Sequence, residues 1–571
     1  MTKITGNLTL TAGGALLARM KAIGVDYIFA NSGTDFPPVI EGLAEAAAKD
    51  IALPEAFVMP HENAAMGMAH GYYLATGRAQ AVMAHTNVGL ANCAIGAINA
   101  ATEQVPVLLF SGRTPVMEKG RLGARTVPIG WGQEMRDQAA LVREATKWEY
   151  ELKFPEQVGE VVDRAYAIAS SVPKGPVYVS LPREVLCEAC PGDQVDAPLR
   201  MQPVQIAPPQ SLVKDAARLI AGAQNPVIIA QRGTGTAAAF DRFASLVDQW
   251  GIPVVQYWAI QLALGTDHPM FGGMDPAPWL VDADVVVVMD CLAPWSPQIH
   301  PLRDDCKVIQ IGADPLYTRF PGRNFAADLS LAGETGDVIM ALADELESLR
   351  AGHEDVCAAR RNKVAARNAD TRAWALAGAA AGNADPMSKA WVSVCLSDAI
   401  RDRTATVFSE LGCPLEPMTL SAHQSWYQEP HSGGLGWSFP AAMGFQLADR
   451  DRLVIATMGD GSYMFANPVA CHQIAEALKL PILILVLNNS EWGAVRQSVT
   501  GIYPNGYAAK TNSMPLTSLA PSPDFTKVAQ ASRAWTAKVE KAADLPAILH
   551  AAIGHIDTNR THALVEITIA A

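Results

Sequence analysis

Short apolar runs, rich in β-branched residues, alternate with alanine-rich stretches along the whole chain. The runs lie at residues 26–31, 81–86, 106–112 and 176–181 in the first third, at 226–233, 253–258, 284–290 and 307–312 in the middle, and at 404–410, 452–460, 481–489 and 562–569 in the last third. Unbroken apolar runs of this length are typical of strands buried on both faces of a parallel sheet, and the stretches between them predict helices. The pattern therefore predicts the α/β fold class, with doubly wound parallel sheets.

Two stretches interrupt this alternation. Residues 190–209 are rich in proline, and residues 349–384 are charged and rich in alanine. Both are typical of linkers or of helices at domain boundaries. Because 571 residues are too many for one hydrophobic core, the interruptions predict three domains, at residues 1–188, 205–348 and 380–571.

Composition narrows the range of partners. Lysine and arginine number 44 against 57 acidic residues, and the resulting net charge of −13 disfavours binding to nucleic acid. No apolar run approaches the roughly 18 residues that span a bilayer, and the first residues lack the features of a signal peptide. We therefore expect a cytoplasmic protein with a small-molecule partner and no membrane contact. The nine cysteines include one CxxC pair, Cys187 and Cys190, without the second pair of a zinc site, so reduced structural thiols are expected.

The apolar run 452–460 stops at an acid between two glycines, Gly459, Asp460 and Gly461. A helical stretch and a second apolar run follow, and the second run ends in an asparagine pair at Asn489. A strand, helix and strand in this order predict two parallel strands, whose ends lie about 4.8 Å apart if the strands are neighbours. Each motif alone is also typical of an ordinary turn or strand end. Together they place oxygen donors for Mg²⁺ at one sheet edge, where glycines let backbone amides approach a diphosphate.

The GDG and NN motifs resemble the signature of the thiamine diphosphate enzymes, which include acetolactate synthase, pyruvate decarboxylase and benzoylformate decarboxylase. The resemblance implies that Asp460, the side chain of Asn489 and the backbone carbonyl of Glu491 bind the metal. It also implies that the residues around the acid bind the cofactor, namely Gly459, Asp460, Gly461, Ser462 and Asn489. The stretch between the motifs is slightly longer than in close relatives, which leaves Asn488 as the alternative ligand.

Glu62 is the candidate for the catalytic carboxylate. It lies in residues 60–77, at the start of a predicted helix rich in small residues, where a buried carboxyl group could share a proton with a ring nitrogen. A glutamate at a helix start is also favoured by the helix dipole alone. The segment resembles the HE…GYARATG pattern of the family, which implies that Glu62 hydrogen-bonds the aminopyrimidine ring of the cofactor.

Residues 431–444 resemble the family stretch that lines the bend of the cofactor. The resemblance implies that Gly433 offers its carbonyl to the 4′-amino group and that Leu435 lies between the two rings. The alternative is a glycine-rich helix start with a packed leucine. Because the resemblance covers nearly the whole chain, it implies a pyrimidine-binding, a middle and a diphosphate-binding domain. It further implies a homodimer or homotetramer with the active site at a subunit interface.

Three further residues bear on the reaction. In all relatives the cofactor adds to the carbonyl of a 2-oxo acid and accepts the electrons left by departing CO₂. Residues 84–100 resemble benzoylformate decarboxylase, which implies that His85 is a catalytic histidine. The same resemblance at residues 267–273 implies that His268 is the second histidine, and at residues 29–34 it implies that Thr34 replaces a substrate-binding serine. Two imidazoles could relay protons near neutral pH. A histidine at position 268 also occurs in relatives that lack such a relay.

Other segments point towards acetolactate synthase or towards a particular substrate. Residues 131–139 resemble a region of that synthase, but residues 290–298 lack its arginine-rich flavin contact, which argues against bound FAD. Trp492, Ala494 and Val495 follow the asparagine pair and predict a pocket for an uncharged aromatic or branched acyl group.

The first hypothesis is therefore a Mg²⁺- and thiamine diphosphate-dependent lyase that decarboxylates a 2-oxo acid without redox chemistry and can also ligate carbon units. The alternatives are an acetolactate synthase-type carboligase, a 2-hydroxyacyl-CoA lyase, and a nucleotide-binding or regulatory protein that has lost catalysis. The joint presence of Glu62, Asp460 and Asn489 argues against the last of these. Residues 501–518 are a candidate cover for the site.

Overall fold

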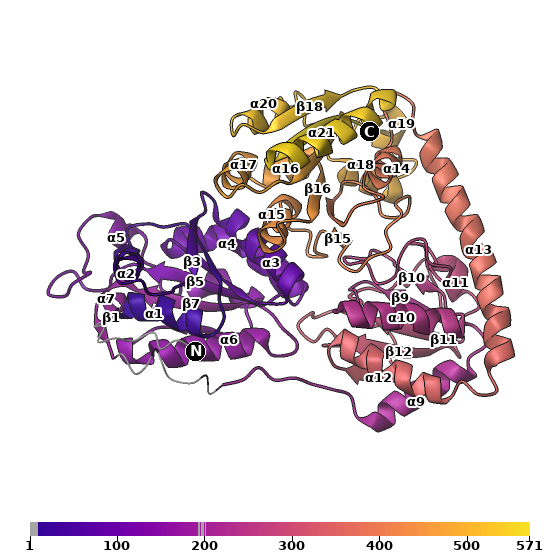
Figure 1. Cartoon of the computed structure of the whole chain (residues 1–571), viewed down its shortest axis with the longest axis horizontal. Helices are drawn as coiled ribbons and strands as arrows, with labels where there is room; N and C mark the ends of the chain where they lie inside the picture. Colours follow the sequence, from indigo (N-terminus) through magenta and orange to yellow (C-terminus); the bar gives the residue numbers. More distant parts are fainter. Residues whose placement is uncertain (1–9, 192–194, 196–198, 200, 571) are drawn as a thin grey trace. The chain divides into compact units, whose positions relative to one another are not determined.

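Three all-parallel sheets organise the chain (Figure 1). The computed structural model describes residues 10–191, 195, 199 and 201–570. The sheets, flanked by helices, confirm the predicted α/β fold with three doubly wound units. Residues 1–9 of the expected first domain, residues 192–194, 196–198 and 200 of the expected linker, and residue 571 lie outside the described residues.

The first sheet has six strands in the order β3-β2-β4-β5-β7-β6. Its strands are β2 (Tyr27–Ala30), β3 (Glu55–Val58), β4 (Gln80–Ala84), β5 (Val107–Arg113), β6 (Glu149–Glu151) and β7 (Val177–Pro182). The helices of this region are α1 (Ala12–Ala22), α2 (Pro37–Ala48), α3 (Glu62–Thr76), α4 (Thr86–Thr102), α5 (Ile129–Gly132), α6 (Val158–Ser170) and α7 (Arg183–Leu186). Strands β1 (Leu10–Thr11) and β8 (Ala189–Cys190) form a separate antiparallel pair. Every residue of β4 and β7 is buried, as the unbroken apolar runs predict.

The middle sheet has five strands in the order β10-β9-β11-β12-β13. Its strands are β9 (Pro226–Ala230), β10 (Val254–Val255), β11 (Val285–Met289), β12 (Lys307–Gly312) and β13 (Leu329–Ala332). The helices here are α9 (Gln210–Gly222), α10 (Ala237–Trp250), α11 (Ala277–Leu280), α12 (Thr335–Ser348) and α13 (Glu354–Ala381). The last is a single helix of 28 residues and covers most of the charged, alanine-rich stretch.

The third sheet has six strands in the order β15-β14-β16-β17-β19-β18. Its strands are β14 (Ala405–Glu410), β15 (Trp426–Gln428), β16 (Leu453–Gly459), β17 (Leu483–Asn488), β18 (Trp535–Val539) and β19 (Ala563–Thr568). The helices are α14 (Lys389–Ala399), α15 (Ser438–Ala448), α16 (Asp460–Phe465), α17 (Pro468–Ala477), α18 (Gly493–Ile502), α19 (Tyr507–Thr511), α20 (Phe525–Gln530) and α21 (Leu545–Asn559). Strands β16 and β17 are parallel neighbours, with Gly459 opposite Leu487, as the sequence predicts.

The first and third sheets have the same topology. When the strands of each sheet are numbered in chain order, both sheets read 2-1-3-4-6-5, and the middle sheet reads 2-1-3-4-5. Strand order therefore reverses between β2 and β4, between β9 and β11, and between β14 and β16. Ligands of open parallel sheets bind at the carboxyl ends of the strands that flank such a switch point.

Tertiary contacts divide the chain into two units. The first comprises the chain up to Val204 with Pro430–Asp451 and Phe465–Leu480, and the second comprises the remainder. Within the first unit, α3 packs against α15 through glycines: a Cβ atom on Gly71 would lie 1.8 Å from the Ala441 carbonyl oxygen. The backbones of the two helices are therefore in direct contact.

Two properties of the chain bear on its chemistry. All nine cysteines are free, and each of them except Cys187 is buried. Among the residues that the structure describes, no helix is both long enough and apolar enough to cross a membrane.

Candidate active site

Glu62 is held at the first turn of α3, where the sequence predicts it. His61 caps this helix by accepting a hydrogen bond from the Asn63 backbone amide. The Glu62 side chain is buried, and its two carboxylate oxygens accept hydrogen bonds from the side-chain amides of Asn31 (3.0 Å) and Asn92 (2.9 Å). Position 89 must be glycine, because a Cβ atom there would lie 2.7 Å from the Glu62 Oε1 atom. The carboxylate orientation is thus fixed from two segments, the end of β2 and helix α4.

His85 lies at the switch point of the first sheet, between the end of β4 and the start of α4. Its Nδ1 atom lies 2.5 Å from Oδ1 of Asp35, which belongs to the loop after β2. Its Nε2 atom lies 3.0 Å from the side-chain nitrogen of Gln133. The hydrogen bond to Asp35 raises the pKa of His85 above its usual value, although burial acts in the opposite direction.

Thr34, the predicted substrate residue, is exposed, and its backbone carbonyl accepts a hydrogen bond from Arg183 (2.9 Å). Its neighbour Asp35, which the sequence analysis missed, makes the contact to His85. The only sequence signal for Asp35 is an acid in the loop after a buried strand.

The loop before α15 is fixed by α4, within the first unit. Asn99 of α4 donates a hydrogen bond from its side-chain amide to the Gly434 carbonyl (2.9 Å) and accepts one from the Ser432 hydroxyl (2.6 Å). Gly433 has a φ of +69° and has open space beside its Cα atom, and Leu435 is half-buried. The positive φ explains a glycine at position 433, and the free space leaves its surroundings accessible.

Asp460 and Ser462 present unpartnered oxygen atoms at the carboxyl end of β16. Both side chains are buried, and within the described residues neither Asp460 Oδ2 nor Ser462 Oγ has a hydrogen-bond partner. Burial raises the pKa of Asp460, although hydrogen bonds from the backbone amides of Gly461 and Ser490 oppose the shift. Buried oxygens of this kind are expected where a cation or phosphate group belongs. This part of the structure therefore fits a metal–diphosphate group.

The two asparagines after β17 differ in their surroundings. Asn488 donates a hydrogen bond to Glu566 of β19 (3.0 Å), and its oxygen accepts from the backbone amide of Ser490 (2.9 Å). The side-chain oxygen of Asn489 accepts from the backbone amide of Glu491 (3.1 Å). The Glu491 carbonyl accepts a hydrogen bond from Gly493, and the Glu491 side chain pairs with Arg496 (2.7 Å).

Within the described residues, no group of three or more His, Cys, Asp or Glu side chains is close enough to hold a metal ion. The predicted ligand set contains one carboxylate, one amide oxygen and one backbone carbonyl, so it does not depend on such a group.

The predicted pocket residues lie at the start of α18. The Trp492 ring lies over Gly461, where a Cβ atom would approach it to 2.3 Å, while Ala494 and Val495 are exposed. The end of segment 501–518 contacts the start of α18, because the Trp492 backbone amide donates a hydrogen bond to the Thr517 carbonyl (2.8 Å).

Acidic residues at the ends of β14 and β15 were not predicted. Glu410 is buried, and the partly exposed Glu429 accepts a hydrogen bond from the Leu411 backbone amide (3.3 Å). Burial and the Glu410 charge raise the pKa of Glu429 to about 7. The Lys389 ammonium donates a hydrogen bond to the Leu411 carbonyl (2.6 Å). Since β14 is the neighbour of β16, these charges lie at the same sheet edge as Asp460.

His268 lies in the middle domain. Its Nδ1 atom accepts a hydrogen bond from the Met270 backbone amide (3.1 Å), and burial lowers its pKa, with Asp248, Asp267 and Arg361 as the surrounding charges. The two predicted histidines thus have pKa values shifted in opposite directions.

Three buried side chains interact at the switch point of the middle sheet. Arg232 after β9 pairs with Asp290 after β11 (3.1 Å), and Tyr317 donates a hydrogen bond to the same carboxylate oxygen (2.9 Å). All three residues are buried.

Three family models match the chain in order. They are the N-terminal TPP binding domain of thiamine pyrophosphate enzymes at residues 10–141, the central domain at 213–342 and the C-terminal TPP binding domain at 415–567.

Similar proteins extend over nearly the whole chain. A probable 2-ketoarginine decarboxylase of Pseudomonas aeruginosa is 28% identical over 86% of this chain and 85% of its own. A probable acetolactate synthase large subunit of Methanocaldococcus jannaschii is 24% identical over 90% and 85%. The solved structure of a thiamine diphosphate-dependent 4-hydroxybenzoylformate decarboxylase from Rhodococcus jostii has a TM-score of 0.77, with 21% identity over 98% of this chain and 99% of that one. Since the three domain models together cover most of the sequence, the chain belongs to the thiamine pyrophosphate enzymes.

Proposed function

We propose that the protein is a thiamine diphosphate- and Mg²⁺-dependent carbon–carbon lyase that decarboxylates a 2-oxo acid without redox chemistry. The observation that carries the proposal is His85, held by a carboxylate at the switch point of the first sheet. An imidazole of this kind can deliver the proton that ends a decarboxylation. With an aldehyde acceptor in place of the proton, the same site would form a carbon–carbon bond.

The cofactor, when bound, supplies the ring that adds to the substrate carbonyl and accepts electrons as CO₂ leaves. Glu62 would hold and protonate the aminopyrimidine ring, and His85 would transfer a proton at the reacting carbon. The proposed metal ligands are Asp460, the Asn489 side chain and the Glu491 carbonyl. The engagement of Asn488 with Glu566 supports Asn489 as the ligand of the two. The remaining cofactor contacts would come from Gly433, Leu435, Gly459, Gly461 and Ser462, and His268 is proposed as a second proton carrier.

Two substrate classes follow from the site and the relatives. An uncharged aromatic or branched acyl group is favoured by the predicted pocket residues, which are Trp492, Ala494, Val495 and Thr34. This class is in line with the 4-hydroxybenzoylformate named for one structural neighbour. The two glutamates at the ends of β14 and β15, Glu410 and Glu429, favour a cationic side chain instead, because a bound cation would stabilise their charged forms. This class is in line with the 2-ketoarginine named for one relative. Both classes are 2-oxo acids, so the decarboxylation step is common to them.

An acetolactate synthase-type carboligase is the second candidate. Gln133 lies in the segment that resembles that synthase, and a relative at 24% identity carries that name. A 2-hydroxyacyl-CoA lyase is the third. The contacts of Asp290 with Arg232 and Tyr317 at the switch point of the middle sheet argue against bound FAD, the flavin that the synthases suggest. We further propose a cytoplasmic homodimer or homotetramer with the active site at the subunit interface, and domains at 1–188, 205–348 and 380–571.

The test is an activity screen of the protein reconstituted with thiamine diphosphate and Mg²⁺. Pyruvate, an aromatic 2-oxo acid and a guanidino 2-oxo acid are offered separately, and CO₂ release and hydroxyketone formation are followed together. We expect CO₂ release with aldehyde as the main product. Acetolactate as the main product from pyruvate would favour the synthase, and absence of CO₂ release from every 2-oxo acid would overturn the proposal.

A further inference from the structure

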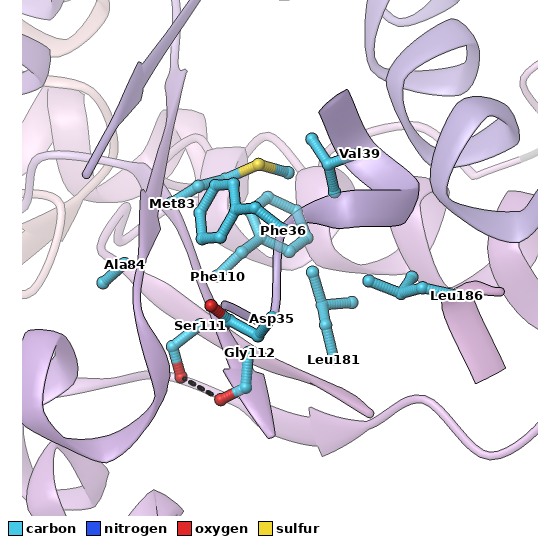
Figure 2. Close-up of a pocket in the computed structure, with 10 residues that line it drawn as sticks. All are labelled: Asp35, Phe36, Val39, Met83, Ala84, Phe110, Ser111, Gly112, Leu181 and Leu186. Carbon is cyan, nitrogen blue, oxygen red and sulfur yellow. Dashed lines mark hydrogen bonds between the residues drawn. The ribbon is translucent and has the colours of Figure 1, made fainter. Parts of the chain in front are cut away.

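Asp35 is a buried carboxylate whose side chain contacts His85. It is 4% exposed, and in the part of the chain that the structure describes it hydrogen-bonds only to His85 Nδ1 (2.5 Å) and to the Thr86 backbone amide (3.3 Å). Figure 2 shows its carboxylate next to Gly112, with Phe36 and Phe110 on its apolar side. A carboxylate in such surroundings interacts strongly with its partner because water screens the pair weakly.

Two glycines create the space that this pair occupies. A Cβ atom on Gly33 would lie 2.1 Å from His85 Nδ1, and one on Gly112 would lie 1.5 Å from Asp35 Oδ2. Both approaches are far below van der Waals contact, so any larger residue at either position would displace the imidazole or the carboxylate. The local sequence is therefore adapted to the Asp35–His85 contact.

The hydrogen bonds define the tautomer of His85. An ionised carboxylate can only accept, so Nδ1 carries a proton and donates it to Asp35. In the neutral ring Nε2 then carries the lone pair, which accepts a hydrogen bond from the Gln133 amide at 3.0 Å. The His85 side chain is 20% exposed, and its Nδ1 atom faces the buried Asp35 carboxylate.

We propose that Asp35 and Gln133 are positioning residues for His85: Asp35 fixes its ring with Nδ1 protonated, and Gln133 holds Nε2 as the atom that gives and takes the proton. The inference rests on the proposed function and extends it to two residues to which no role has been assigned. In the forward step the Nε2–H bond breaks, a C–H bond forms at the carbon that has lost CO₂, and His85 becomes neutral. Solvent then returns a proton to Nε2.

The charges around His85 support this role. Asp35 raises its pKa through both the hydrogen bond and its charge, and the nearby Glu62 adds a weaker effect in the same direction. A simple helix-capping function of Asp35, through the Thr86 amide, would not require the contact to Nδ1.

The experiment measures the protonation of His85 directly. Diethyl pyrocarbonate reacts with neutral imidazole, so the modification of the peptide that contains His85, followed by mass spectrometry against pH, gives its titration midpoint in the full-length protein. In Asp35→Asn we expect the midpoint to fall by about one pH unit, because the carboxylate that favours the charged ring is gone. In Gln133→Ala we expect it to rise, because the neutral ring loses a hydrogen-bond donor. His268, read from the same digests, serves as the internal reference and should not move.

Opposite shifts of the His85 midpoint in Asp35→Asn and Gln133→Ala would be specific to the proposed positioning roles. A general loosening of the fold would move the midpoint in the same direction in both variants. Gln133 follows a short, exposed helix, so its variant remains informative even if Asp35→Asn fails to fold. An unchanged midpoint in Asp35→Asn, or a fall in Gln133→Ala, would overturn the inference. In an active enzyme, the basic limb of kcat against pH should follow the midpoint while KM stays constant. Absence of turnover with any 2-oxo acid would contradict the proposed function but leave the midpoint test intact.

Discussion

At the scale of single residues, the first expectation concerns Glu62. Its two oxygens are held by Asn31 and Asn92, so Glu62→Gln preserves the shape of the site and removes the exchangeable proton. We expect kcat to fall by about 10²- to 10⁴-fold, the usual contribution of a positioned acid or base. Calorimetry should find thiamine diphosphate binding retained in the presence of Mg²⁺.

The control is Glu55→Gln, which alters an exposed glutamate of β3 in the same sheet. It should leave turnover and cofactor binding unchanged. Full activity in Glu62→Gln would show that Glu62 is not a catalytic residue.

A second residue-scale prediction concerns Glu429. Its pKa is raised by burial to about 7, whereas a glutamate in the unfolded chain titrates near 4.3. Between these pH values the folded protein keeps a proton that the unfolded chain releases, so the free energy of unfolding falls as pH rises through this window. The Glu429→Gln variant has no carboxyl group at this position, so its free energy of unfolding does not fall for this reason as pH rises. Relative to wild type, the cofactor-free variant should gain about 1–2 kcal/mol between pH 5 and pH 8, allowing for the partial exposure of the side chain.

Denaturant titrations at the two pH values measure this gain, with Glu41→Gln on the exposed face of α2 as the control. An equal difference between Glu429→Gln and wild type at both pH values would show that Glu429 is ionised throughout.

At the scale of helices and strands, the backbone contact between α3 and α15 gives a prediction. Gly71→Ala places a methyl group 1.8 Å from the Ala441 carbonyl oxygen, so one helix backbone must shift. We expect a loss of about 2 kcal/mol or more in the free energy of unfolding, measured by denaturant titration. We also expect weaker cofactor binding, since α3 begins with Glu62 and α15 follows the Gly433 loop.

Gly554→Ala is the matched control. Gly554 is also helical, but nothing lies within 4 Å of a Cβ atom there. This variant should gain up to about 1 kcal/mol from helix propensity. A similar result for both glycines would contradict the packing argument.

The central strands could be predicted because they are apolar on both faces: the run 452–460 contains β16, and the run 481–489 contains β17. The edge strand β3 was missed because only three of its four residues are apolar, which is a shorter run than those of the central strands. The neighbourhood of Asp460 and Asn489 could be predicted because only the helical stretch of α16 and α17 lies between two apolar strands, β16 and β17. The contact of Asp35 with His85 could not, since it depends on β2 and β4 being neighbours while β3 lies at the edge.

At the scale of the whole molecule, the proposed interface site can be tested with two inactive variants. If Glu62 of one subunit and Asp460 of another form one active site, then a mixed dimer of Glu62→Gln and Asp460→Asn chains contains one intact site and one doubly substituted site. Random mixing of co-expressed chains should restore about one quarter of wild-type activity, since half of the dimers are mixed. Each variant expressed alone should be inactive. Activity no higher than that of the single variants, with mixed dimers verified by affinity tags, would place both residues in one subunit's site.

The glycine contacts between α3 and α15 also constrain recombination with related genes. The two helices are separated by more than 350 positions in the sequence, yet each is shaped to the other's backbone. A chimera with a single crossover between the two helices would take α3 from one parent and α15 from the other, so their contact surfaces would no longer match. Exchanges that transfer residues 62–76 and 438–448 as a matched set are therefore expected to yield folded hybrids more often than exchanges of either block alone.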